Sequence, residues 1–383
     1  MGRITKLIAI SASFLMLAPL STTTFGARGP KNLRAGGVYV LTNQPNNAVA
    51  AFRRNAKGVL SFVGQFSTGG AGNPVAIPPD PPVDPLASQG ALVMSDGNRF
   101  LIAVNAGSNQ VSVLKINKND LELVDVRNSG GSRPISLALQ HDLLYVLNEG
   151  GTANITGFTF DEGDGTLTPL AGSTRPLIAG GSADPGQVGF APDGDSLVVT
   201  DKAGNRFNTY TIDDDGLPSA PTANASSGIT PFGFAFNNSG TLVVSEAFAL
   251  MPNQAAASSY DVANNGTLSL ITGSVHNNQT ASCWVVIPRN GKIAFVSNTA
   301  SGTISSYRIG ENGSLSLLNA TAADLGASSA PRDMALSVNS KILFVQTGGG
   351  QSVAAFRIGR NGSLTQIDTA GGLPFGAQGI TAK

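Results

Sequence analysis

The chain alternates short apolar runs with tight polar turns, and the same order recurs along its length. Residues 190–201, 286–298 and 335–347 each hold two apolar runs around a turn rich in Pro, Asp, Asn, Ser or Gly. This pattern predicts a β-strand, a tight turn and a second β-strand. Residues 303–315 and 352–364 then add an alternating strand and a glycine-centred turn. They predict a third and a fourth strand in each unit.

The repeat has a period close to that of propeller blades, which take roughly 40 to 50 residues each. Seven residues mark the ends of the predicted second strands: Asn43, Asn105, Asn148, Asp201, Glu246, Asn298 and Thr347. Only six complete first strands lie between them, so residues 377–382 are expected to supply the seventh. That strand would join N-terminal strands that start near Val38 and close the ring, which removes exposed sheet edges.

These features predict the fold class. We expect an all-β, seven-bladed β-propeller of four-stranded antiparallel blades over residues 28–383, closed by the C-terminal strand. A single tryptophan in 383 residues argues against the tryptophan–aspartate type of blade. The pattern contains neither a long helical period nor an alternation of strands and helices.

Residues 1–27 have the pattern of a secretory signal peptide. Arg3 and Lys6 precede an apolar stretch, and small residues near Ala27 provide a cleavage site. The apolar stretch is about 14 residues long, whereas a membrane-spanning helix needs roughly 20. The sequence therefore predicts a cleaved signal and a mature chain that is secreted to the periplasm or outside the cell, without a membrane span.

Composition narrows the partners and cofactors. Lys and Arg number 24, as do Asp and Glu, and only 13% of residues are charged, which argues against a nucleic-acid partner. One cysteine and two histidines exclude a disulfide framework and a Cys/His zinc site. No cofactor is expected, although a channel calcium ion held by carboxylates and carbonyls stays open. We expect a monomer that binds a small, sugar-like molecule.

The long connections gather on one face of the predicted ring. In a four-stranded blade, the connection into the innermost strand and the connection between the second and third strands lie on the same face. Residues 69–89, 171–185, 247–257 and 272–282 fall in such connections. Long irregular loops often carry function, so the ligand site is expected on this first face. The alternative is that the proline-rich segment 69–89 is only a rigid spacer.

Three charged residues in consecutive blades are the candidate catalytic residues. Glu149, Arg206 and Glu246 fall near the ends of second strands or the start of a third strand on the first face. Arg206 would clamp a carboxylate or stabilise an oxyanion, and either glutamate would act as general base if burial raised its pKa. The alternative is that they form salt bridges between blades at the channel mouth.

The first residues of the inner strands, with a nearby histidine, are the candidate substrate-binding residues. Trp284 would be either a stacking platform for a sugar or planar ligand, or a plug of the channel. His276 lies in a predicted loop on the first face, whereas His141 is expected to be exposed on the opposite face. Cys283 is expected to be a small apolar filler. The other residues expected to contact the substrate are Gln187, Arg332 and Asp333.

Over the whole mature chain, the sequence resembles the seven-bladed propeller lactonases, which include 6-phosphogluconolactonases and 3-carboxymuconate cyclases. The segments that carry the resemblance are residues 187–194, 201–206, 231–236 and 245–247. The resemblance implies a propeller fold and action on a lactone. The family pattern also has an arginine where Arg206 stands and an acidic residue near the position of Glu149 or Glu246.

Enzymes of that family typically carry histidines beside the proline that opens several inner strands. At those positions this chain has Ser136, Gln187, Gly233, Trp284 and Asp333. A general base would then come from Glu149, Glu246, Asp333 or His276.

Two functions are compatible with this sequence. In the first, a secreted lactonase-type propeller opens or forms a sugar-acid or muconate-type lactone, which predicts a deep polar pocket. In the second, a non-catalytic secreted propeller binds a glycan, a small ligand or a protein through its loop-rich face, which predicts a flat or plugged channel mouth. The fold alone does not decide between them.

Overall fold

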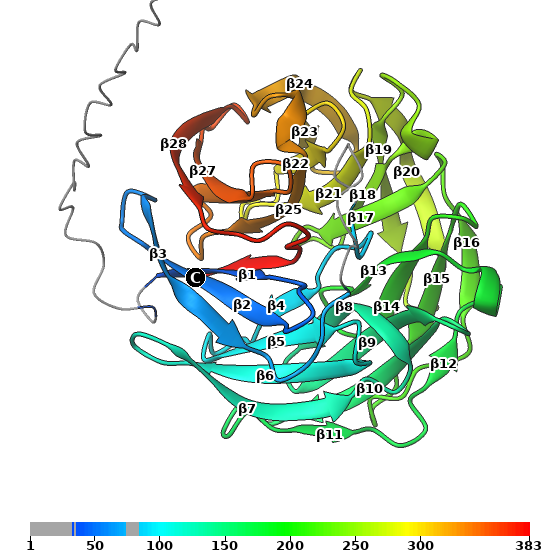
Figure 1. Ribbon diagram of the computed structural model, residues 1–383. Helices are drawn as coiled ribbons and strands as arrows, with labels where there is room; N and C mark the ends of the chain where they lie inside the picture. Colours follow the sequence, from blue (N-terminus) through cyan, green and yellow to red (C-terminus); the bar gives the residue numbers. More distant parts are fainter. Residues whose placement is uncertain (1–32, 34–35, 74–83) are drawn as a thin grey trace, which may run out of the picture.

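The computed structural model describes residue 33 and residues 36–73 and 84–383. These residues form seven β-sheets arranged as a ring (Figure 1), which confirms the predicted seven-bladed propeller. Within the described residues, no helix is long and apolar enough to cross a membrane. The predicted signal peptide at residues 1–27 lies outside the described residues.

Each blade is an antiparallel sheet, and the blades are numbered 1 to 7 in the chain order of their second strands. The innermost strands are β29 (Ile380–Ala382), β4 (Leu92–Met94), β8 (Ser132–Gln140), β13 (Pro185–Phe190), β17 (Pro231–Phe236), β21 (Ser282–Val286) and β25 (Pro331–Leu336). The second strands are β1 (Gly37–Leu41), β5 (Phe100–Asn105), β9 (Leu143–Gly150), β14 (Ser196–Asp201), β18 (Leu242–Glu246), β22 (Ile293–Asn298) and β26 (Ile342–Thr347).

The third and fourth strands complete each blade toward the outside of the ring. The third strands are β2 (Ala48–Arg54), β6 (Gln110–Ile116), β10 (Asn154–Phe160), β15 (Arg206–Thr211), β19 (Ala256–Val262), β23 (Thr303–Ile309) and β27 (Ser352–Ile358). The outer strands are β3 (Leu60–Ser67), β7 (Leu121–Asn128), β11 (Leu167–Pro169) with β12 (Arg175–Pro176), β16 (Thr222–Ala225), β20 (Leu268–His276), β24 (Leu315–Asp324) and β28 (Leu364–Gly371). Short 3-10 turns cover Gly180–Ser182, Phe248–Leu250 and Ala327–Ser329.

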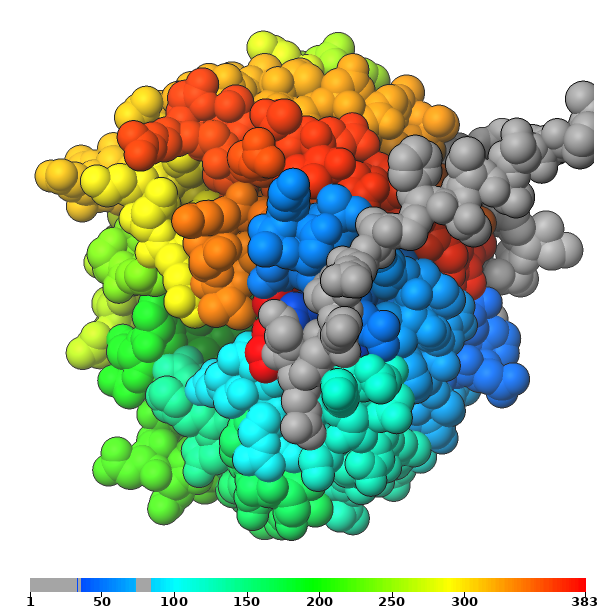
Figure 2. Space-filling view, turned by 90° about the vertical axis from the view of Figure 1, so that its left-hand side faces the viewer, coloured from blue at the N-terminus to red at the C-terminus, as the bar shows by residue number. Residues whose placement is uncertain are grey.

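Blade 1 is built from two distant parts of the chain. β29 pairs with β1, with Val40 opposite Ile380 and Val38 opposite Ala382, so the red end of the chain lies beside its blue start (Figure 1). In the side view, blue blade 1 also lies against orange-red blade 7 (Figure 2). The predicted closure by the C-terminal strand is confirmed, although the strand is shorter than the expected 377–382.

Burial follows the position of each strand in its blade. All six residues of the second strands β5 and β26 are buried, because neighbouring blades cover both faces of the sheet. The outer strand β3 instead leaves several of its side chains exposed. Continuous apolar runs therefore mark the second strands, and mixed runs mark the outer ones.

Two of the residues used to measure the repeat form the same structural contact in their blades. Asn105 and Asn298 are the last residues of β5 and β22. The side-chain amide of Asn105 donates to Ser112 Oγ at 2.7 Å, and that of Asn298 donates to Ser305 Oγ at 2.8 Å. We call this contact, between the end of a second strand and a hydroxyl on the third strand, the blade clasp.

Candidate active site

The channel is filled at the first face by residues 84–90, here called the channel segment. The carbonyl oxygen of Ser88 accepts hydrogen bonds from Trp284 Nε1 at 2.9 Å and from Gln378 Nε2 at 2.8 Å. Gln89 donates to the Val285 carbonyl at 2.8 Å and accepts from the Val285 amide at 3.0 Å. The mouth on the first face is therefore plugged, as the binding hypothesis predicts.

Trp284 and Gln187 hold this plugged arrangement together. Trp284 is 0% exposed, and its ring lies 5.1 Å from that of Phe232. Gln187 donates to the Phe234 carbonyl at 3.1 Å and accepts from the Phe234 amide at 2.7 Å. Trp284 thus fills the core beneath the channel segment, and in this arrangement its ring has no surface free to stack on a ligand. The side-chain amide of Gln187 is occupied by the neighbouring inner strand.

Below the channel segment, a cavity of about 320 Å³ remains in the channel. Gln187 and Asp333 both line it, so the structure brings these two candidates together. The Asp333 carboxylate accepts from the Met334 amide at 2.9 Å, and burial raises its pKa to about 7. Arg332 is fully buried and donates to the Ala377 carbonyl at 3.3 Å. Arg332 does not line this cavity.

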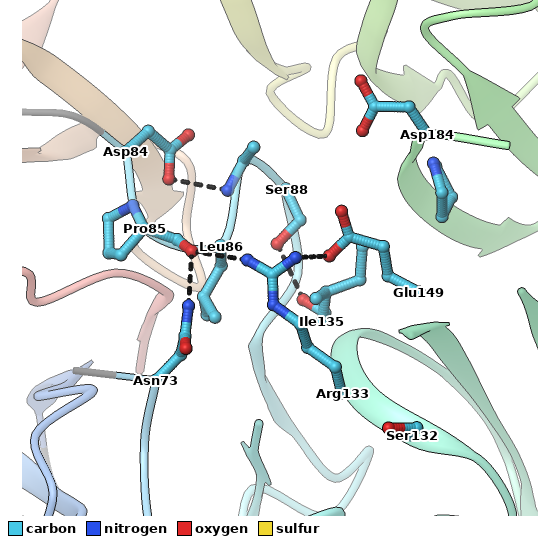
Figure 3. A network of polar contacts seen from close by, with 12 residues as sticks. Asn73, Asp84, Pro85, Leu86, Ser88, Ser132, Arg133, Ile135, Glu149 and Asp184 are labelled. Carbon is cyan, nitrogen blue, oxygen red and sulfur yellow. Dashed lines mark hydrogen bonds and ion pairs between the residues drawn. The ribbon is translucent and has the colours of Figure 1, made fainter. Parts of the chain in front are cut away.

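Four charged residues form a mouth cluster beside the channel segment: Arg133, Glu149, Asp184 and Lys202. Arg133 bridges the Glu149 carboxylate and the Pro85 carbonyl, the latter at 2.9 Å (Figure 3). Lys202 Nζ lies 3.0 Å from Asp184 Oδ1 and donates to the Ala87 carbonyl at 2.7 Å. The mouth cluster therefore fixes the channel segment and also leaves acidic groups at the surface.

Glu149 is the carboxylate of this cluster that best suits proton transfer. Its side chain is 17% exposed, so one part is desolvated and another still meets solvent. Burial raises its pKa, while the nearby Arg133 and Lys202 charges oppose the rise. One carboxylate oxygen contacts Arg133, and the other points away from it (Figure 3). A half-buried carboxyl with a raised pKa is suited to general acid–base chemistry.

The backbone places Arg133 at the mouth by a feature that recurs in other blades. Arg133 has a φ of 54°, and Thr230, Ala281 and Ala330 also have positive φ directly before or at the start of their inner strands. A left-handed backbone conformation costs free energy for any residue other than glycine. Its recurrence at the same place in four blades indicates that the blade geometry requires it. Arg133 differs from the other three in its charge, which reaches Glu149.

Arg206 forms its ion pair with Asp201 of its own blade. Its Nε lies 3.2 Å from Asp201 Oδ2, an ion pair that lacks hydrogen-bond geometry. Asp201 also accepts from the backbone amides of Asp184 at 3.1 Å and Gly204 at 3.2 Å. The ion pairs join Arg206 to Asp201 and Glu149 to Arg133, within blades 4 and 3 respectively. They do not join the three candidate catalytic residues to one another.

Glu246 occupies the blade-clasp position of blade 5. It is fully buried and accepts hydrogen bonds from Ser258 Oγ at 2.6 Å and from the Gly228 amide at 2.9 Å. Ser258 pairs with Val244 just as Ser305 pairs with Val296, so the contact matches that of Asn298. Burial raises the pKa of Glu246. These contacts support a structural role for its carboxyl.

We expect Glu246→Gln to keep the fold and Glu246→Ala to lose about 2 kcal/mol of unfolding free energy. Glutamine retains an oxygen for the donors of Gly228 and Ser258 and resembles the asparagines of other blades. Alanine leaves both buried donors without an acceptor, at about 1 to 3 kcal/mol. Urea unfolding of both variants measures the difference. Equal losses in the two variants would contradict the clasp role.

His276, His141 and Cys283 do not belong to the mouth cluster. His276 ends strand β20 rather than lying in a loop, so the expected loop over 272–282 was wrong for its first residues. Its Nδ1 lies 2.7 Å from the Gln254 carbonyl oxygen. His141 has a side chain that is 79% exposed, as expected. Cys283 is buried, and burial raises the pKa of its thiol to about 12, which suits a filler rather than a nucleophile.

Sequence reasoning missed three members of the mouth cluster: Arg133, Asp184 and Lys202. A weak signal existed for Arg133, which stands before Pro134 at the start of an inner strand. Lys202 directly follows the repeat residue Asp201, as Glu149 follows Asn148. Among the described residues, no group of three or more His, Cys, Asp or Glu side chains is arranged to hold a metal ion. The expectation of no cofactor stays a prediction.

Residues 91–248 match the family model Lactonase, 7-bladed beta-propeller. The lactonase resemblance expected from the sequence is thereby confirmed, and the matched segment includes Glu149, Arg206 and Glu246. Trp284, His276, Arg332 and Asp333 lie outside it. No curated protein sequence matches the chain.

Solved lactonase-type propellers share the fold across nearly the whole chain. A protein from Bacteroides uniformis, provisionally named 6-phosphogluconolactonase, is 20% identical with a TM-score of 0.67, over 90% of this chain and 98% of its own. A second, from Bacteroides fragilis and likewise provisionally named, is 18% identical with a TM-score of 0.67, over 96% and 100%. The periplasmic gluconolactonase of Pseudomonas aeruginosa is 15% identical with a TM-score of 0.65, over 90% and 98%. At these identities the likeness shows the fold.

Proposed function

We propose that this protein is a secreted lactonase that hydrolyses a small, unphosphorylated lactone at the mouth cluster. The observation that carries the proposal is the environment of Glu149, a half-buried carboxylate of raised pKa that contacts Arg133 on one side and meets solvent on the other. The lactonase match over residues 91–248 includes this residue. One solved structure of the same fold is named a periplasmic gluconolactonase, which supports an unphosphorylated substrate, whereas two others carry the name 6-phosphogluconolactonase.

The chemistry needs only the side chains of the cluster and one water molecule. Glu149 takes a proton from water as the water oxygen attacks the lactone carbonyl carbon. Arg133 has five N–H donors, and those free of Glu149 and Pro85 stabilise the negative charge that develops on the carbonyl oxygen. The ring C–O bond then breaks, and Glu149 returns the proton to the departing oxygen. The product is a hydroxy acid.

The same contacts limit the substrate. The channel segment fills the mouth, so the lactone must bind at the rim rather than deep in the channel. The two cations of the cluster, Arg133 and Lys202, already pair with Glu149 and Asp184. A phosphorylated substrate would need unpaired cations, so an unphosphorylated sugar-acid lactone fits better.

The test is proton release by the mature protein on a panel of unphosphorylated aldonolactones and muconolactones. Glu149→Gln removes the base, and we expect kcat/KM to fall about 100-fold or more. Because the base must be ionised, the wild-type rate should rise as pH passes through the raised pKa of Glu149. The matched control is Glu246→Gln, which should keep its activity. Loss of activity in the control with Glu149→Gln fully active would overturn the assignment of the base.

A second function, a non-catalytic propeller that binds a glycan, a small ligand or a protein, is favoured by one observation. The channel mouth is plugged by residues 84–90, and Trp284 beneath it is buried. Rates equal to the buffer blank across the whole lactone panel would support this function and reject hydrolysis.

A further inference from the structure

A separate cavity of about 500 Å³ lies on the face opposite the channel segment. It is formed by turns that join first to second strands in blades 5 and 6, and third to fourth strands in blades 6 and 7. Its volume lies within the range of small-molecule sites, about 300 to 1,000 Å³. None of the candidate residues of the mouth cluster lines it.

At blade 6 the turn glycine of the next blade sits differently from those at blades 5 and 7. In blade 7, Gly58 of the next blade lies against Ile342, and in blade 5, Gly313 of the next blade lies against Thr241. Ile293 is the equivalent residue of blade 6, since Ile293 pairs with Arg308 as Ile342 pairs with Arg357. At blade 6, however, the equivalent glycine of the next blade is Gly362, and it lies closest to Leu318 and Ser306 and not to Ile293. The apolar side chain of Ile293 is left as part of the cavity lining.

The lining combines apolar groups with cations. Ile293, Ile309 and Leu318 provide apolar surface. Lys292, Arg308 and Arg360 carry positive charge, against the single acidic residue Glu311. Among the described residues, no ion pair or hydrogen bond joins any of these three cationic side chains to another residue. In a chain with only 13% charged residues and no net charge, this is a local excess of unpaired cations.

We propose that this cavity binds a small organic anion that has an apolar, ring-sized body and one carboxylate. The apolar body would lie against Leu318 and the small exposed parts of Ile293 and Ile309. The carboxylate would be held by Arg308, whose planar guanidinium suits bidentate pairing, with Lys292 beside it. Glu311 favours a ligand with a single negative charge over one with several. The site is separate from the proposed lactonase site.

The chain offers matched controls for both cations. Arg357 and Lys341 occupy in blade 7 the positions that Arg308 and Lys292 occupy in blade 6. Neither lines this cavity. Replacing Arg357 or Lys341 with glutamine removes the same charge from the same kind of turn or strand, without touching the proposed site.

The experiment is calorimetric titration of the full mature chain with 2-naphthoate, with 2-naphthalenemethanol as the uncharged analogue. Arg308→Gln should weaken naphthoate binding about tenfold or more, since hydrogen bonds to charged groups contribute about 1.5 to 3 kcal/mol. Lys292→Gln should weaken it less. Arg357→Gln and Lys341→Gln should change it less than twofold, and the uncharged analogue should bind at least tenfold more weakly than naphthoate.

Three results would overturn the proposal: no binding of naphthoate, equal binding of the uncharged analogue, or equal weakening by the blade 6 and blade 7 variants. The last would mean a general effect of charge. Glu149→Gln should leave naphthoate binding unchanged, so failure of the lactonase proposal and failure of this one are separable.

Discussion

Replacing Trp284 with alanine is expected to lower the free energy of unfolding by about 4 kcal/mol, within the range of about 3 to 5 kcal/mol for deletion of a buried Trp or Phe side chain. Trp284 is fully buried, packs against Phe232 and donates to the Ser88 carbonyl. The alanine variant leaves a cavity under the channel segment and removes one of the hydrogen bonds that hold Ser88. We therefore expect the channel segment to become accessible to proteases in this variant.

Urea unfolding and limited proteolysis measure these two effects. Trp284→Phe is the control, because it keeps an aromatic ring against Phe232. It loses the indole donor, at about 1 kcal/mol, and part of the indole volume, so it should cost less than Trp284→Ala. A Trp284→Ala protein as stable and as protease-resistant as the wild type would show that Trp284 does not support the plug.

Asp333 is expected to make the folded state less stable as pH rises from about 4 to about 8. Burial raises its pKa from the ordinary 3.8 to about 7. Between these values the folded protein holds a proton that the unfolded chain has released, so unfolding becomes easier as pH increases. The difference between the two pKa values corresponds to a loss of up to about 4 kcal/mol in the free energy of unfolding. This destabilisation is complete above the folded-state pKa of Asp333 and absent below its unfolded-state pKa.

The measurement is the unfolding free energy of the wild type and of Asp333→Asn at several values of pH across that window. Other titrating groups affect both proteins alike, so the difference between them isolates Asp333. We expect this difference to shift by several kcal/mol in favour of the variant from pH 4 to pH 8. A difference that stays constant over that window would show that Asp333 ionises freely in the fold.

The propeller could be predicted from the sequence because its strands and turns follow from short runs of apolar and polar residues. The predicted end of β18 at Glu246 and that of β22 at Asn298 are the observed ends. Each second strand lies between two neighbouring blades, so its apolar run is continuous, and β5, β18 and β22 end at clasp residues. The predicted ends at Asn43 and Asn148 were wrong by two residues, since β1 ends at Leu41 and β9 at Gly150. The missing seventh inner strand followed from counting, and residues 380–382 supply it.

The site was harder to predict because it depends on contacts between distant segments. Nothing local shows that residues 84–90 enter the channel and cover Trp284. Glu246 was grouped with Glu149 because both stand near strand ends. In the repeat, however, Glu246 occupies the buried position that Asn148 occupies in blade 3, and Glu149 is one residue further along its blade. Arg133 reaches Glu149 through a left-handed backbone that the sequence pattern does not reveal.

The pairing of β29 with β1 has a consequence for synthesis on the ribosome. β1 is made before the other described strands of the ring and β29 after all of them, so blade 1 has an open inner edge until translation of residues 380–382 is finished. Blades 2 to 7 have no such wait, since their inner strands are made first. A nascent chain should thus leave the ribosome as an unclosed arc of folded blades in which the inner edge of blade 1 is unpaired. Neighbouring chains on the same polysome would pair through these edges.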